Sequence, residues 1–199
     1  MIEWVTNIVA AGGWPGVLAL MFLENLFPPI PSELIMPLAG YLAAEGRLSV
    51  WAVVAAGTTG SVLGALFWYA LGRAIGPVRF LALVDRYGRW LTLTRPETLA
   101  AIHWFERHGA AAVFLGRMVP GVRTLISIPA GLAGMPFGRF LLFTFCGSLI
   151  WVSGLTLAGY LLQAQYERVH VLLDPATTIL VVMLAVIYVW RVLRWRRQD

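Results

Sequence analysis

Charged residues, lysine and cysteine are all scarce in this sequence. Aspartate, glutamate, lysine and arginine together make up 13% of the 199 residues, and all 15 basic residues are arginines. The high isoelectric point therefore reflects scattered arginines and does not indicate a nucleic-acid-binding surface. The single cysteine, Cys146, excludes an internal disulfide and a cysteine-rich metal site, and the histidines show no metal-ligand spacing. We expect neither a metal ion nor another cofactor.

Apolar sequence is abundant instead. Hydrophobic residues make up 59% of the chain and the mean hydropathy is +0.77, whereas soluble domains have an apolar share of roughly 45–50%. Nine tryptophans are typical of the aromatic belts at membrane interfaces. The sequence therefore predicts an all-α polytopic membrane protein.

Three apolar segments indicate transmembrane helices. Residues 49–72 and 140–162 carry no charged residue except at their flanks, and each reaches the ~20 residues that a helix needs to cross a bilayer. A third segment, at about residues 175–190, is followed by four arginines. Long arginine side chains at such a helix end can extend to the membrane surface.

Two further apolar blocks, residues 14–44 and 110–135, are interrupted by proline. The expected breaks are at Pro28, Pro29 and Pro31 in the first block and at Pro120 and Pro129 in the second. Proline removes a backbone donor and clashes with the preceding helical turn. Each limb of about 15 residues then reaches only part of the way across a ~30 Å hydrocarbon core. We therefore predict two re-entrant helical hairpins, each entering and leaving on one side.

The polar segment between these blocks, residues 73–108, contains six arginines. Such a loop is expected on the cytoplasmic side, and the arginine-rich C-terminus is expected there too because two crossings separate them. Thr94, Pro96 and Glu97 form the pattern of a helix N-terminus with a capping box. We expect an interfacial amphipathic helix to begin here.

The two proline-containing blocks have similar spacing. Gly16 precedes Glu24 by eight residues. Gly109 precedes Arg117 by eight residues as well. A glycine–arginine pair then opens the crossing in both halves, at residues 46–47 and 138–139. A hairpin plus one crossing per half would place the second half upside down, as in the inverted repeats of secondary transporters. The alternative is chance similarity between apolar segments of low complexity.

This pattern predicts a single membrane domain over residues 1–199. Its expected parts are repeat 1 at 14–72, a cytoplasmic amphipathic segment at 73–108, repeat 2 at 109–162, and a C-terminal helix with a basic tail at 170–199.

Four charged residues lie inside the predicted hairpins: Glu24, Glu33, Arg117 and Arg123. Each charge costs ~2.5–3.5 kcal/mol to place at the centre of a membrane helix, so each needs compensation. One interpretation is a set of internal salt bridges that hold the hairpins together. The other is that the arginines bind a phosphate group while the glutamates change protonation. Both interpretations stay open on the sequence alone.

Several motifs resemble the DedA family, whose members are also described as SNARE-associated or VTT-domain proteins. The resemblance rests on residues 24–33 (ENLFPPIPSE), 64–76, 116–124 (GRMVPGVRT) and 129–131 (PAG). It implies that Glu24 with Glu33 and Arg117 with Arg123 match the functional acidic and arginine pairs of the family. Ala65 stands where many members have an aspartate.

The resemblance implies a lipid transporter of the bacterial cytoplasmic membrane that returns undecaprenyl phosphate for cell-envelope synthesis. Arg117 and Arg123 would bind the phosphate headgroup, and Glu24 and Glu33 would couple to protons or pair with the arginines. The expected partners are thus a polyprenyl phosphate or another anionic lipid and the surrounding membrane lipids, with the oligomeric state left open.

Three alternatives remain: a phospholipid transporter or scramblase, a proton-dependent transporter of small solutes, and a membrane enzyme of lipid phosphate metabolism. The enzyme is the least favoured, because the three aspartates lack the spacing of a metal-dependent transferase and no catalytic histidine–arginine cluster is evident. We therefore do not expect an enzyme.

Overall fold

The computed structural model of the chain describes residues 2–27, 32–91 and 93–162, together with positions 186, 190 and 192. Within these residues the secondary structure is helical and includes no strand. The helices are α1 (Ile2–Leu26), α2 (Ser32–Ala44), α3 (Val50–Leu91), α4 (Arg95–Gly116), α5 (Val122–Leu125), α6 (Ser127–Leu132) and α7 (Phe137–Leu161). The prediction of an all-helical chain is confirmed for this part.

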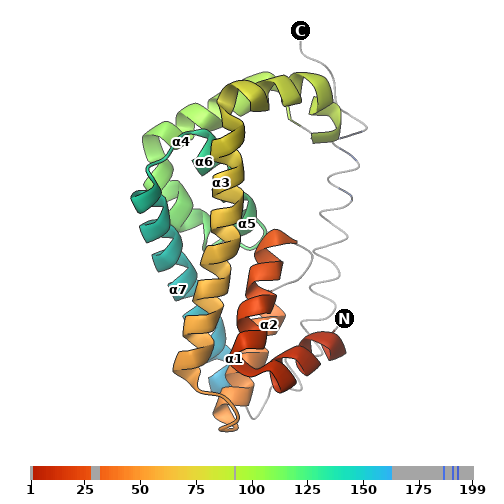
Figure 1. Cartoon of the computed structure of the whole chain (residues 1–199), viewed down its shortest axis with the longest axis vertical. Coiled ribbons are helices and arrows are strands. Elements are labelled where there is room, and N and C mark those ends of the chain that lie inside the picture. Colours follow the sequence, from red (N-terminus) through yellow and green to blue (C-terminus); the bar gives the residue numbers. More distant parts are fainter. Residues whose placement is uncertain are drawn as a thin grey trace.

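Two of the long helices contain a sharp break. The backbone leaves the helical conformation at Gly13 of α1 (φ 58°, ψ −144°) and at Gly76 of α3 (φ 68°, ψ 165°). Positive φ is strained for a residue with a Cβ atom, so glycine suits both positions. Pro15 and Pro77 follow the breaks. Figure 1 shows α3 running along the long axis of the molecule, with its last part bending over at one end.

Three described helices are long and apolar enough to cross a membrane: Asn7–Leu26, Val50–Gly88 and Phe137–Leu161. The second and third contain almost all of the crossings predicted at residues 49–72 and 140–162. The first combines the N-terminal limb of the predicted first hairpin with the helix before Gly13. The segment predicted at residues 175–190 lies outside the described residues, and so do Pro28, Pro29 and Pro31.

The remaining apolar helices are short. α2 has 13 residues, which corresponds to a length of about 20 Å against a hydrocarbon core of ~30 Å. α5 and α6 have 4 and 6 residues. Pro120 lies in the turn before α5, and Pro129 lies within α6. None of these three helices could cross a bilayer alone.

The predicted capping box at the start of α4 is confirmed. The Glu97 backbone N–H donates to Thr94 Oγ1 at 3.4 Å, and the Thr94 backbone N–H donates to Glu97 Oε2 at 2.9 Å. The helix continues without interruption through Gly109 to Gly116. The amphipathic segment and the first limb of the predicted second hairpin therefore form one helix.

Glycines allow two very close helix crossings, α2 on α7 and α6 on α3. Four glycines face a backbone carbonyl of the opposite helix: Gly40 that of Thr156, Gly159 that of Pro37, Gly131 that of Tyr69 and Gly72 that of Ile128. Gly40 and Pro37 lie 91 residues before Gly131 and Ile128. Gly159 and Thr156 lie 87 residues after Gly72 and Tyr69. The same crossing therefore occurs twice, each time between a short helix of one half and the long helix of the other.

The apolar core has two clusters. The first joins α1, α2, α3 and α7 around Val17, Met36 and Val53. The second joins α3, α4, α6 and α7 around Tyr69 and Phe140, whose rings stack with centroids 4.2 Å apart. The Tyr69 hydroxyl also donates to the Met135 carbonyl at 2.5 Å, which fixes the connection between α6 and α7 to α3.

We predict that Gly159→Ala destabilises the protein by roughly 1–3 kcal/mol, because the added methyl group would overlap the Pro37 backbone and force apart a packed crossing. Gly154→Ala on the same helix is the matched control, since a Cβ atom there meets nothing within 4 Å. Thermal unfolding of the purified variants in detergent measures the difference. Equal stability of the two variants would contradict the role assigned to this crossing.

Candidate functional site

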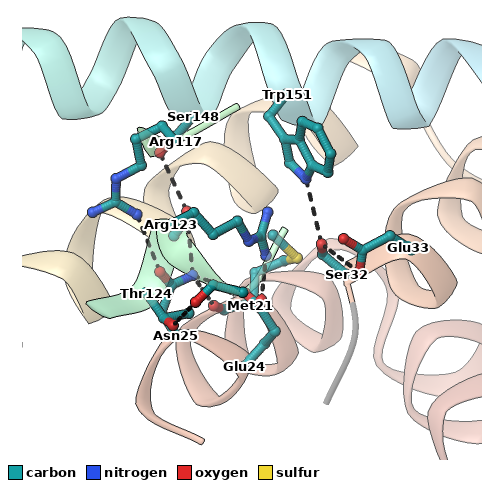
Figure 2. Close-up of polar contacts among 12 residues, drawn as sticks. Met21, Glu24, Asn25, Ser32, Glu33, Arg117, Arg123, Thr124, Ser148 and Trp151 are labelled. Carbon is teal, nitrogen blue, oxygen red and sulfur yellow. Dashed lines mark hydrogen bonds and ion pairs between the residues drawn. The ribbon is translucent and has the colours of Figure 1, made fainter. Parts of the chain in front are cut away.

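Glu24 and Arg123 form a buried ion pair between α1 and α5. Arg123 Nη2 contacts Glu24 Oε1 directly, and the two residues are only 4% and 3% exposed. Figure 2 shows the Arg123 side chain directed toward Glu24. Removing one member of such a pair would leave an uncompensated charge in the interior, which is strongly unfavourable.

Arg117 is buried as deeply, at 1% exposure, but its partners are neutral. Its Nη1 donates to Asn25 Oδ1 at 3.2 Å, and its Nη2 donates to Ser127 Oγ at 2.9 Å. Its Nε finds no hydrogen-bond partner among the described residues. No carboxylate of the described chain lies within ion-pair distance of this guanidinium.

Asn25 connects the ion pair with Arg117. Its Nδ2 lies 2.8 Å from Glu24 Oε2 and 3.2 Å from Ser61 Oγ, while its Oδ1 accepts from Arg117. The side chain is fully buried. One amide therefore orients the carboxylate with its donors and the second arginine with its acceptor.

Two glycines place Asn25 and Arg117 opposite each other. A Cβ atom at Gly64 of α3 would collide with the Asn25 side chain, and one at Gly147 of α7 would meet Arg117 Cβ at 2.8 Å. Each glycine thus receives the end of a helix from its own half of the chain. These contacts make Asn25 the structural counterpart of Arg117 in the first half of the chain. The sequence spacing instead aligns Arg117 with Glu24, the residue before Asn25.

Two tryptophans on the long helices donate hydrogen bonds to residues at the edges of the site. Trp68 Nε1 donates to the Asn25 carbonyl at 2.8 Å, and Trp151 Nε1 donates to Ser32 Oγ at 3.4 Å. The Arg123 guanidinium carbon also lies 5.8 Å from the Trp151 ring centroid. This cation–π contact gives Arg123 a second stabilising partner.

Glu33 stands apart from the other three predicted charges. It lies half-buried in the first turn of α2, where the helix N-terminus favours a carboxylate. The Ser32 hydroxyl donates to its Oε2 at 3.3 Å. The described residues give it no ion pair with an arginine. The structure therefore brings together Glu24, Arg117 and Arg123 and leaves Glu33 at the edge (Figure 2).

Several neutral residues of the site were not predicted from the sequence. They are Asn25, Ser32, Ser61, Ser127, Ser148 and Trp151. Ser61 of α3 and Ser148 of α7 have their hydroxyl oxygens 3.3 Å apart and extend the polar layer from Asn25 across the interface of the long helices. The available signal was an asparagine within an apolar helix, because a buried amide needs hydrogen-bond partners.

No group of three or more histidine, cysteine, aspartate or glutamate side chains that could hold a metal ion is present in the described part of the chain. The chemical character of the site is instead two guanidinium groups with one carboxylate, surrounded by hydroxyl, amide and indole groups.

Comparison with known proteins gives a family match and several similar proteins. The VTT domain family matches residues 30–161. A protein of Staphylococcus aureus named undecaprenyl phosphate transporter A is 33% identical over 190 residues, covering 94% of both chains. The protein of the same name in Bacillus subtilis is 30% identical, covering 94% of this chain and 88% of its own. No solved structure matches.

A third relative carries a different name. The "alkaline phosphatase-like protein" of Lactococcus lactis subsp. lactis is 38% identical over 194 residues, covering 97% of this chain and 91% of its own.

Fold and comparisons together define a helical membrane protein with apolar helices long enough to span a bilayer. The chain belongs to the VTT-domain family, the DedA family of the sequence resemblance.

We predict that Glu24→Gln and Arg123→Gln each destabilise the protein by roughly 3–5 kcal/mol, because each leaves its buried partner without an opposite charge. The double variant should lose less than the sum of the two single losses. Unfolding of the three variants in detergent measures the coupling, with Glu33→Gln as the control at an unpaired carboxylate. Additive losses would show that the ion pair contributes nothing.

Proposed function

We propose that this protein transports a polyprenyl phosphate, undecaprenyl phosphate in particular, across the bacterial cytoplasmic membrane. The observation that carries the proposal is the excess of positive charge in a buried site. Among the described residues, Arg117 and Arg123 face one carboxylate there, that of Glu24. Planar guanidinium groups bind phosphate oxygens through paired hydrogen bonds. The names of the relatives in S. aureus and B. subtilis support this substrate.

The two arginines would take different parts in binding. Arg117 has a buried, unpartnered Nε and neutral partners, so a phosphate oxygen would bind it, once the site opens, without displacing a charge. Arg123 is held by Glu24, so the phosphate must compete with this carboxylate. Protonation of Glu24 would release Arg123 and give proton coupling, while the polyprenyl tail stays in the bilayer. Glu33, beside the site, is proposed to assist in proton transfer or in charge pairing.

We infer an inverted repeat with two re-entrant hairpins as the architecture for this transport. The duplicated crossing of α2 with α7 and α6 with α3 supports it, and so does the short length of α2, α5 and α6. Binding sites of transporters with inverted repeats commonly lie where the repeats meet. We also propose the domain limits that the sequence pattern predicts. We place residues 73–108 and the C-terminus on the cytoplasmic side, on the basis of their arginines.

A lipid phosphatase is the second candidate, favoured by the name of the Lactococcus relative. A transporter and a phosphatase differ in their product: transport leaves the phosphate ester intact, whereas hydrolysis releases inorganic phosphate. Two further alternatives are a phospholipid transporter or scramblase and a transporter of small solutes. They differ from our proposal in the substrate that is moved and in whether its movement is coupled to protons.

The test is reconstitution of the purified chain in lipid vesicles. We expect faster transbilayer movement of undecaprenyl phosphate than of phosphatidylcholine, with no inorganic phosphate released and a further increase under a pH gradient. Arg117→Gln should slow transport about tenfold or more, since it removes charge-assisted hydrogen bonds to the phosphate. Arg47→Gln, at an exposed arginine, is the matched control.

Equal movement of undecaprenyl phosphate with and without protein would refute the proposal. Release of inorganic phosphate would indicate the phosphatase. If the Arg117→Gln variant transported undecaprenyl phosphate at the wild-type rate, Arg117 would not be a phosphate-binding residue.

A further inference from the structure

A cavity lies away from the buried arginine site, where the middle of α4 meets the connection between α6 and α7. Its volume is about 410 Å³. Its lining includes Arg107, His108, Ala111, Gly134, Met135 and Arg139. In Figure 1 this is the end of the molecule at which α7 begins beside α4.

The charges around this cavity are unbalanced. Arg107 and Arg139 are both exposed, and neither forms an ion pair with a carboxylate of the described residues. Glu106 is the one carboxylate among the described residues that line the cavity. Two guanidinium groups around one cavity provide paired donors that match the oxygens of a phosphate group.

The backbone adds donors at the same place. α7 begins at Phe137 after Pro136, and no side chain caps its first turn. The first N–H groups of a helix lack acceptors within the helix, so they favour an anion. A Cβ atom at Gly134 or Gly138 would meet nothing within 4 Å, so the approach to these groups is open.

Apolar aromatic side chains adjoin the cavity. Trp104 is 52% exposed and packs against His108 with ring centroids 5.5 Å apart. Phe137, at the start of α7, is 54% exposed. Exposed aromatic residues beside cationic groups are typical of membrane interfaces, where acyl chains and headgroups meet. This setting favours a lipid over free phosphate.

The described residues at the opposite end of the protein do not show this charge excess. The glycine–arginine pair at residues 138–139 corresponds to the pair at 46–47. Arg47, however, has its Nη1 3.9 Å from Glu45 Oε2, so its charge is partly neutralised. By the matching of Gly16 with Gly109, the counterpart of Arg107 is the uncharged Trp14. The two ends are therefore related in backbone but different in charge.

We propose that the cavity between α4 and α7 binds the phosphate headgroup of an anionic membrane lipid, through Arg107, Arg139 and the first turn of α7. The site is separate from Arg117 and Arg123 and does not require transport. Because the described residues form this site at one end and not at the other, it would retain anionic headgroups on one face of the protein.

Native mass spectrometry of the full chain in detergent, titrated with phosphatidylglycerol or phosphatidylcholine, tests this site. We expect the Arg107→Gln/Arg139→Gln variant to bind phosphatidylglycerol about tenfold more weakly at one site, with phosphatidylcholine binding unchanged, because charge-assisted hydrogen bonds are lost. Ala111→Trp should block the same site by filling the cavity without changing its charge. Arg47→Gln is the matched control at the other end, and melting temperatures of all variants verify folding.

Unchanged phosphatidylglycerol binding in both cavity variants would overturn the proposal. Displacement of phosphatidylglycerol from the wild-type protein by equimolar inorganic phosphate would identify free phosphate as the ligand and would overturn the assignment to a lipid. Loss of binding in Arg117→Gln but not in the cavity variants would place the lipid at the buried site alone. If the protein failed to transport undecaprenyl phosphate, the cavity variants would still be expected to lose phosphatidylglycerol binding. The two proposals can therefore fail separately.

Discussion

The fold depends on compensating two guanidinium groups in an apolar interior. Arg123 has Glu24 as its counter-charge, whereas Arg117 depends on the dipoles of Asn25 and Ser127. A buried charge with imperfect compensation requires partners in fixed positions. The two arginines lie in α5 and at the end of α4, and these partners come from α1 and α6, so the helices must converge on one small region. The close helix packing is the structural means of that convergence.

Glycine provides this packing. Gly64 and Gly147 bring the ends of α1 and α4 against the long helices, directly at Asn25 and Arg117. The crossings of α2 on α7 and α6 on α3 depend in the same way on glycines that face backbone carbonyls. Small residues permit such approach where no hydrophobic force drives helices together in a bilayer. The polar site and the helix crossings are therefore parts of one constraint.

Local patterns were sufficient to predict part of this structure. Apolar length located the helices over residues 49–72 and 140–162, and the capping box at Thr94 located the start of α4. Charge in apolar sequence identified Glu24, Arg117 and Arg123, which lie in one site: Glu24 contacts Arg123, and Asn25 connects this pair with Arg117. Their pairing, the role of Asn25 and the contact with Trp151 depend on residues far apart in the chain. The breaks at Gly13 and Gly76 were missed, although a proline follows each glycine closely and this combination is typical of a helix break.

The different partners of the two arginines have a consequence for charge balance. Glu24 is the one carboxylate buried in the described part of the chain. A phosphate monoester in its doubly charged form would balance both arginines only if Glu24 became neutral or moved away. In this structure Glu24 neutralises one of the two arginines. With both arginines and Glu24 ionised, the site has a net charge of about +1. Binding of the phosphate and protonation of Glu24 would therefore favour each other, which links lipid to proton through one residue.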